Sequence, residues 1–205
     1  MTELRMDAPN EKQRRFLLDR HRHIAYGGAR GGGKSWAVRT KAKLLALRYA
    51  GIKLLIVRRT LRELQNNHID PLRQELAGVA KYKAADKRFE FPNGSVLTFG
   101  YCACDGDLGQ YQGAEYDVVF LDEAGQLQKA WIDAINACVR GTNGFPKRTY
   151  YTLNPGGPSH GYFKRLFIDR RFEPGEREDA YSFVQALVAD NRVLLERQPD
   201  YLQQL

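Results

Sequence analysis

The sequence of 205 residues predicts one α/β domain with a mainly parallel central sheet that is flanked by helices. Short apolar runs typical of buried strands alternate along the chain with segments of helical periodicity. The composition, 43% hydrophobic and 27% charged, is that of an ordinary globular protein. No apolar stretch approaches the length of a membrane span, and the polar N-terminus has no signal-peptide core. We therefore expect a cytosolic protein without a membrane partner.

Five apolar runs predict strands of the sheet, at residues 24–26, 54–57, 118–121, 149–153 and 181–187. Helices are expected between them, from residue 34 to about 49, from residue 60 onward, over 127–139 and 162–168, and in the polar C-terminal segment. Pro71 suits the first position of a helix and not its interior, so we expect the second helix to break and restart there. Two alternating runs, 89–91 and 96–99, flank Pro92-Asn93-Gly94-Ser95 and predict an inserted β-hairpin.

The first predicted strand runs into a glycine-rich loop, and a helix follows. The loop fits the pattern G-x-x-x-x-G-K-[ST] at every fixed position. Glycines let backbone N–H groups turn inward around phosphates, Lys34 brings a charge to the β- and γ-phosphates, and Ser35 offers its hydroxyl to Mg²⁺. The motif therefore predicts a site for ATP and Mg²⁺ and the fold of a P-loop NTPase of the RecA/ASCE-like kind. Its predicted nucleotide-binding residues are Gly28, Ala29, Arg30, Gly31, Gly32, Gly33, Lys34 and Ser35.

An acidic pair follows the predicted strand 118–121. Asp122 is the expected metal-holding carboxylate, acting through the water shell of Mg²⁺, and Glu123 is the expected general base that polarises the attacking water. A hydrolytic enzyme needs such a base, whereas a protein that uses ATP only as a switch gains nothing from it. The pair therefore favours an ATPase.

Positive charge is concentrated in the first third of the chain. The formal net charge is +8, and residues 20–62 hold twelve Lys and Arg residues but no Asp or Glu. Such a segment attracts phosphate, whether of a nucleotide or of nucleic acid. We expect contact with nucleic acid on this ground.

Several further motifs resemble the large terminase subunit of tailed bacteriophages. The P-loop and the Asp-Glu pair are generic to many ATPases, whereas the other motifs are specific, and the resemblance runs from about Gln13 to the last residue. These motifs are Glu11-Lys12-Gln13, Arg30 inside the loop, Tyr111-Gln112-Gly113-Ala114-Glu115-Tyr116-Asp117, Thr152-Leu153-Asn154-Pro155, Ala189-Asp190-Asn191 and Asp200-Tyr201-Leu202-Gln203-Gln204-Leu205.

The resemblance implies roles for individual residues. Gln13 would recognise adenine, and Asn154 would sense the γ-phosphate and couple hydrolysis to movement. The family is held to need an arginine at the γ-phosphate, and two candidates are present. Arg140 would act as a finger in trans on a neighbouring subunit, and Arg30 would act in cis from the loop. We interpret Arg140 as the finger and Arg30 as a positioning residue, although the sequence leaves the choice open.

The resemblance also implies an ATP-hydrolysing motor that drives double-stranded DNA into the viral procapsid. Its partners would be DNA, the portal protein and the small terminase subunit, in a homo-oligomeric ring at the procapsid portal in the host cytoplasm. The isolated chain is expected to be a monomer. Residues 20–170 would form the ATPase core and 171–205 the start of the linker subdomain, and the family's nuclease domain is expected to be absent.

Two alternatives remain. The first is a RecA-like helicase or translocase, which needs two motor domains or a ring of one, and the sequence holds one P-loop motif. The second is a non-motor, ATP-dependent DNA-binding switch, against which Glu123 argues. A steady-state ATPase assay with and without double-stranded DNA discriminates between these classes.

Overall fold

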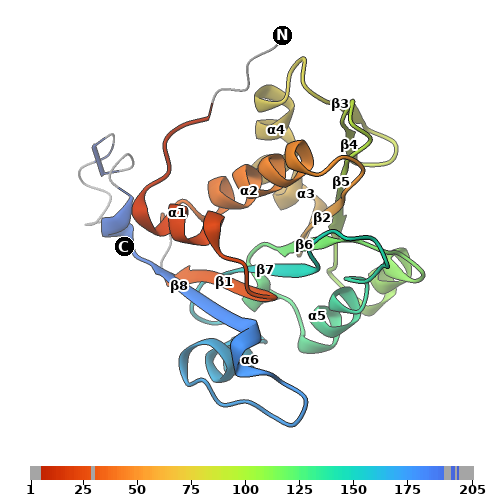
Figure 1. Cartoon of the computed structure of the whole chain (residues 1–205). Helices are drawn as coiled ribbons and strands as arrows, with labels where there is room; N and C mark the ends of the chain where they lie inside the picture. Colours follow the sequence, from red (N-terminus) through yellow and green to blue (C-terminus); the bar gives the residue numbers. More distant parts are fainter. Residues whose placement is uncertain (1–5, 29–30, 192–194, 197, 199–205) are drawn as a thin grey trace.

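An eight-stranded sheet forms the centre of the computed structural model, which describes residues 6–28, 31–191, 195–196 and 198. The strand order is β3-β4-β5-β2-β6-β7-β1-β8 (Figure 1). Strands β5, β2, β6, β7, β1 and β8 pair in parallel, while β3 and β4 pair antiparallel and extend the sheet beyond β5. The predicted parallel sheet and the hairpin insertion are therefore confirmed. The strands are β1 His23–Gly28, β2 Lys53–Arg58, β3 Lys81–Lys83, β4 Arg88–Glu90, β5 Val96–Tyr101, β6 Val118–Leu121, β7 Arg148–Leu153 and β8 Tyr181–Ala186.

Helices cover both faces of this sheet. In Figure 1, α1 to α4 lie over one face and α5 and α6 lie over the other. The α-helices are α1 Glu11–Leu18, α2 Lys34–Arg48, α3 Leu61–Leu64, α4 Asp70–Glu75, α5 Lys129–Asn136 and α6 His160–Phe163. Short π and 3-10 turns complete the list: η1 Gln65–Ile69, η2 Asp105–Tyr111, η3 Ala124–Gln126, η4 Lys164–Ile168, η5 Glu178–Ala180 and η6 Val188–Asp190.

Two hydrophobic cores lie on opposite faces of the sheet. In β2, Leu54 and Ile56 belong to the core beneath α1 and α2, whereas Leu55 and Val57 belong to the core beneath α5 and α6. Successive side chains of a strand point to opposite faces, so a strand that is covered on both sides is apolar throughout. This packing is the physical reason for the continuous apolar runs of the sequence.

The structure differs from the sequence-based expectation in its helices. Helix α1 was not predicted, although Asn10 and Gln13 form a reciprocal capping box at its start. The expected break at Asp70-Pro71 is a change of helix type: the chain stays helical through the π turn η1, and α4 then begins with Pro71 in its first turn. Strand β3, a short Lys-Tyr-Lys segment, was also not predicted.

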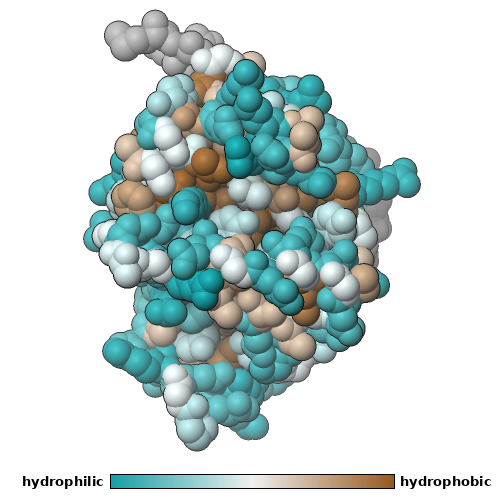
Figure 2. Space-filling view, turned by 90° about the vertical axis from the view of Figure 1, so that its right-hand side faces the viewer, coloured by the Kyte–Doolittle hydropathy of each residue, from teal (hydrophilic) through white to brown (hydrophobic). Residues whose placement is uncertain are grey.

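The surface, the question of a membrane-spanning helix and the C-terminal segment can be compared with the sequence. The hairpin end of the sheet faces the viewer in Figure 2, where hydrophilic side chains cover most of the surface and hydrophobic ones appear in small groups. Within the described ranges, no helix is long and apolar enough to span a lipid bilayer. The motif at 200–205 and most of the expected C-terminal helix lie outside the described residues.

Candidate nucleotide site

The glycine-rich loop joins the end of β1 to the start of α2. Gly31 and Gly33 adopt φ values of 77° and 70°, a left-handed conformation that favours glycine. A Cβ atom at Gly33 would lie 2.5 Å from the side-chain nitrogen Nε2 of Gln13, which is too close for the two atoms to coexist without a shift. The loop opens at the N-terminus of a helix of 15 residues whose first turn carries no acidic side chain, which is a favourable place for phosphate. Ala29 and Arg30 lie outside the described residues, so their roles stay predictions.

Three side chains hold the carbonyl groups of this loop from outside. The Tyr26 hydroxyl donates to Gly32 O at 3.1 Å, and Asn191 Nδ2 donates to Gly31 O at 2.5 Å. Gln13 Nε2 donates to Gly33 O at 3.4 Å. These bonds hold the carbonyl oxygens toward groups outside the phosphate-binding space, as expected of a loop that turns its N–H groups toward an anion.

Gln13 connects α1 to the loop. Its amide oxygen accepts from the backbone N–H of Asn10 at 2.9 Å while the Asn10 side chain accepts from the N–H of Gln13 at 2.8 Å. The residue is 8% exposed. Its predicted contact with adenine stays a prediction, and a cavity large enough for a base lies beside it. That cavity, of about 330 Å³, is lined by Asn10, Glu11, Lys12, Ala189 and Asp190.

The acidic pair lies at the carboxyl end of β6, next to the loop. Asp122 is 1% exposed, and its Oδ2 accepts a hydrogen bond of 3.4 Å from the Ser35 hydroxyl. The structure thus brings together the two side chains that were predicted to hold Mg²⁺. Hydroxyl and carboxylate oxygens are the ligands that Mg²⁺ prefers, directly or through water, so these residues fit that ion.

Two basic side chains that the sequence reasoning missed surround the pair. Arg58 contacts Asp122 Oδ2 through Nε at 3.1 Å and Glu123 Oε1 through its terminal nitrogen at 2.9 Å. His68 Nε2 lies 2.7 Å from Asp122 Oδ2. Arg58 follows the apolar run 54–57, and the carboxyl ends of parallel strands meet at one edge of a sheet. Its place in the sequence therefore indicated that it lies near Asp122 and Glu123. The place of His68 gave no such indication.

The polar end of β7 completes the surroundings of Asp122. The Thr152 hydroxyl donates to Asp122 Oδ1 at 2.5 Å and accepts from the backbone N–H of Glu123 at 2.8 Å. Burial by itself raises the pKa of the Asp122 carboxyl, but His68, the charge of Arg58 and the Thr152 hydroxyl outweigh burial and hold this pKa well below its usual range. The carboxylate is therefore ionised at every physiological pH.

Lys34 and Asn154 face the same space. Burial lowers the pKa of the Lys34 ammonium group, and the nearby charges of Asp122 and Glu123 oppose that change. Asn154 Nδ2 lies 3.5 Å from Glu123 Oε1, and its Oδ1 is buried without a hydrogen-bond partner among the described residues. A cavity of about 260 Å³ is lined by residues 31–36 and by Glu123 and Asn154. The predicted phosphate sensor and the predicted base therefore lie side by side.

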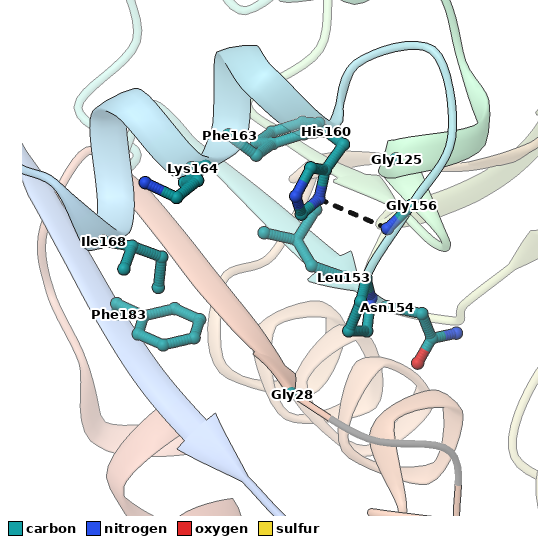
Figure 3. Close-up of a pocket in the computed structure, with 11 residues that line it drawn as sticks. Gly28, Gly125, Leu153, Asn154, Gly156, His160, Phe163, Lys164, Ile168 and Phe183 are labelled. Atoms are coloured by element: carbon teal, nitrogen blue, oxygen red, sulfur yellow. Dashed lines mark hydrogen bonds between the residues drawn. The ribbon is translucent and has the colours of Figure 1, made fainter.

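A second cavity of about 260 Å³ lies behind this edge and is apolar. Leu153, Phe163, Ile168 and Phe183 contribute side chains to it, whereas the Asn154 side chain points away from it (Figure 3). The cavity therefore belongs to the packing behind the site and not to the phosphate-binding space.

Arg140 lies far from this edge. Its Nε is 3.3 Å from Glu115 Oε1, both side chains are about half exposed, and its backbone N–H donates to Tyr116 O. Tyr116 precedes β6 while Asp122 follows it, and six residues of extended chain span roughly 20 Å. Arg140 therefore cannot act on its own subunit's site, and its predicted action in trans stays a prediction.

The basic segment 20–62 is partly buried, and its predicted contact with nucleic acid stays a prediction. Lys34, Lys41, Lys43 and Arg58 are buried. Lys41 Nζ donates to the carbonyl of Leu17, Lys43 pairs with Glu75, and Arg58 pairs with the acidic pair. Much of the charge is thus used inside the protein.

The fold is that of an α/β protein of the P-loop NTPase class. A family model described as phage terminase large subunit matches residues 20–205. The chain belongs to this family. No curated protein sequence matches it.

Solved structures agree in fold. The large terminase of a thermophilic bacteriophage superposes with a TM-score of 0.76 at 19% identity, covering 97% of this chain and 50% of that one. The complex of the same phage's large terminase with ATP-gamma-S superposes with a TM-score of 0.74 at 18% identity, covering 95% of this chain and 49% of that one. The ATPase domain of the Thermus phage P74-26 large terminase superposes with a TM-score of 0.68 at 15% identity, covering 96% of this chain and 87% of that one. The chain thus spans about half the length of the large terminase from the thermophilic bacteriophage.

Proposed function

We propose that this chain is the Mg²⁺-dependent ATPase domain of a large terminase and that it drives double-stranded DNA into a viral procapsid. One observation carries the proposal: Lys34, Ser35, Asp122, Glu123 and Asn154, from three separate segments, converge on one edge of the sheet. The large terminase of the thermophilic bacteriophage has been solved with ADP and with ATP-gamma-S, which supports nucleotide binding by a domain of this fold.

In the proposed reaction, the loop N–H groups and Lys34 bind the β- and γ-phosphates. Ser35 and Asp122 would hold Mg²⁺, which when bound neutralises charge on the phosphate oxygens. Asn154 would bind the γ-phosphate with the carboxamide that already lies near Glu123. Gln13, whose side chain bonds to the loop carbonyl of Gly33, would recognise adenine.

Glu123 would accept the proton of the attacking water. In this structure its Oε1 is bonded to Arg58 and its Oε2 accepts from Gln126 Nε2 at 2.5 Å. Both carboxylate oxygens are thus already in contact with donors other than water. Glu123 therefore has to part from these donors before it can act on water.

The arginine at the γ-phosphate is proposed to be Arg140 of a neighbouring subunit in a ring, with Arg30 as a positioning residue of the loop. The exposure of Arg140 on the edge of the sheet opposite the site supports this choice. Residues 20–170 are proposed as the ATPase core and 171–205 as the start of a linker subdomain. The portal protein and small terminase subunit are the proposed partners, in the host cytoplasm.

Exposed cations at the amino ends of the strands support contact with DNA. Arg20, Arg22, Arg48 and Lys53 are exposed, and among the described residues none of them forms an ion pair. Arg148 Nε donates to Arg20 O, which brings the starts of β1 and β7 together. DNA would be held there by its phosphates and not by its sequence.

The test is steady-state release of phosphate from ATP, with and without Mg²⁺ and double-stranded DNA. Turnover that needs Mg²⁺ and rises with DNA is expected. A switch protein would bind ATP without turnover, and a helicase would also separate strands.

A salt titration of DNA binding tests the surface. Replacing Arg22, Lys53 and Arg148 with Gln should reduce the slope of log K against log salt by about 3, roughly one for each phosphate contact. The same substitutions at Lys81, Lys83 and Lys87, near the hairpin, are the control and should leave the slope unchanged. Equal effects of both triple variants would contradict the assignment.

A further inference from the structure

His68 is wholly buried, and the reaction described above does not use it. Its Nε2 lies 2.7 Å from Asp122 Oδ2, whereas its Nδ1 is buried without a hydrogen-bond partner in the described part of the chain. A buried polar atom without a partner is costly and uncommon in native proteins. An apolar side chain at this position would avoid that cost, so the bond from Nε2 is the feature that explains an imidazole here.

The backbone that carries His68 is also unusual. It lies in η1, a π turn between α3 and α4, in which the N–H of Asp70 donates to the carbonyl of Gln65. A π turn inserts one residue into a helix, and such insertions occur frequently at functional sites. Leu64, which precedes the turn, and Ile69, its last residue, are fully buried in the core, so the turn is fixed and holds the imidazole against the end of β6.

The contacts of Asp122 show what this bond does. Oδ1 accepts from Thr152, and Oδ2 accepts from His68, from Arg58 at 3.1 Å and from Ser35 at 3.4 Å. A donor on each oxygen prevents rotation of the carboxylate plane. Of the donors to Oδ2, His68 is the closest, and it belongs to an element that contributes nothing else to the site.

We propose that His68 is a positioning residue for the magnesium site, whose Nε2–H holds the Asp122 carboxylate with Oδ2 toward the Ser35 hydroxyl. The proposal rests on the proposed function, because it takes Asp122 and Ser35 as the groups that hold Mg²⁺. Partners that orient metal-binding side chains commonly change metal affinity ten- to a hundredfold when they are replaced.

Two substitutions separate the bond from simple filling of space. In His68→Gln, the side-chain amide nitrogen falls close to the position of Nε2 and can donate to Asp122. In His68→Asn, the amide nitrogen falls near Nδ1 and cannot reach. His23→Gln is the matched control, since His23 is a partly buried histidine bonded to the Tyr151 hydroxyl at the opposite edge of the sheet.

The measurement is equilibrium binding of ATP by the whole chain, with Mg²⁺ and with EDTA, together with the thermal midpoint. The Asn variant should lose about tenfold or more of the tightening that Mg²⁺ gives, while its affinity in EDTA stays that of the parent. The Gln variant and the His23→Gln control should keep the tightening.

Equal behaviour of the Gln and Asn variants, whether both retain or both lose the Mg²⁺ effect, overturns the assignment to Nε2. Loss of affinity in EDTA as large as that in Mg²⁺ also overturns it, because that result is the mark of a purely structural role. A parent chain that binds ATP equally with and without Mg²⁺ would instead contradict the proposed function itself.

Discussion

Replacing Thr152 with Val tests whether β7 holds the acidic pair in place. Thr152 is completely buried, and its one hydroxyl serves both members of the pair: it donates to Asp122 Oδ1 and accepts from the backbone N–H of Glu123. Valine has nearly the same shape, so the substitution removes these two hydrogen bonds and little else.

The expected cost follows from the two bonds. A hydrogen bond to an ionised group contributes about 1.5–3 kcal/mol, and leaving a buried N–H without a partner costs about 1–3 kcal/mol. The free energy of unfolding should therefore fall by about 3 kcal/mol or more. Thr149→Val is the matched control on the same strand, since the Thr149 hydroxyl is buried but donates to the neutral Asn136 carboxamide at 2.9 Å. It should cost only about 1 kcal/mol.

Denaturant unfolding gives both free energies, and phosphate release gives the rates. Thr152→Val should also lower ATP turnover, because the carboxylate of Asp122 and the backbone of Glu123 lose their common anchor, whereas Thr149→Val should keep the parent rate. Equal destabilisation by the two substitutions, together with unchanged turnover in Thr152→Val, would refute this reasoning.

Three further predictions concern charge. Lys34→Ala should abolish hydrolysis and weaken ATP binding, because it removes the lysine of the phosphate cradle; retained turnover in a phosphate-release assay would contradict the P-loop assignment. Burial, aided by the charge of Arg22, lowers the pKa of His23 to about 4. Because this lies below the unfolded value of about 6.5, stability should fall as the pH drops from 6.5 toward 4, by about 2 kcal/mol at pH 5. Denaturant unfolding at several pH values should show that this loss is absent in His23→Gln. A mixture of Lys34→Ala and Arg140→Ala subunits at high concentration should recover ATPase activity that neither shows alone, whereas a mixture without activity would remove Arg140 as the finger in trans.

The sequence was sufficient for the parts of the fold that depend on local pattern. The apolar runs 54–57 and 118–121 are strands because both faces of the sheet are covered, and the loop before Lys34 has a motif whose spacing fixes its conformation. The order of the strands was not readable in the same way. Strand β2 lies between β5 and β6, and that neighbourhood depends on packing over long sequence separations.

The site was predictable where a residue type follows a strand, and not where tertiary contacts recruit a residue. Asp122 and Glu123 come directly after a strand and were singled out on that ground, and Arg58 could have been found by the same rule. Asn154 also follows a strand, but it was singled out from the family resemblance. His68 reaches Asp122 from a π turn, which no periodicity in the sequence indicates. The burial of Lys41 and Lys43 could not be predicted from the basic segment, because it depends on carbonyl and carboxylate partners in α1 and α4.

The most direct test of an ATPase built on this acidic pair is a comparison of Glu123→Gln with the parent chain. Glutamine is nearly isosteric with glutamate but cannot accept the proton of the attacking water. The variant should bind ATP with Mg²⁺ about as well as the parent and turn it over about a hundredfold or more slowly. An unchanged rate of phosphate release in the variant, at equal ATP occupancy, would show that the catalytic base lies elsewhere.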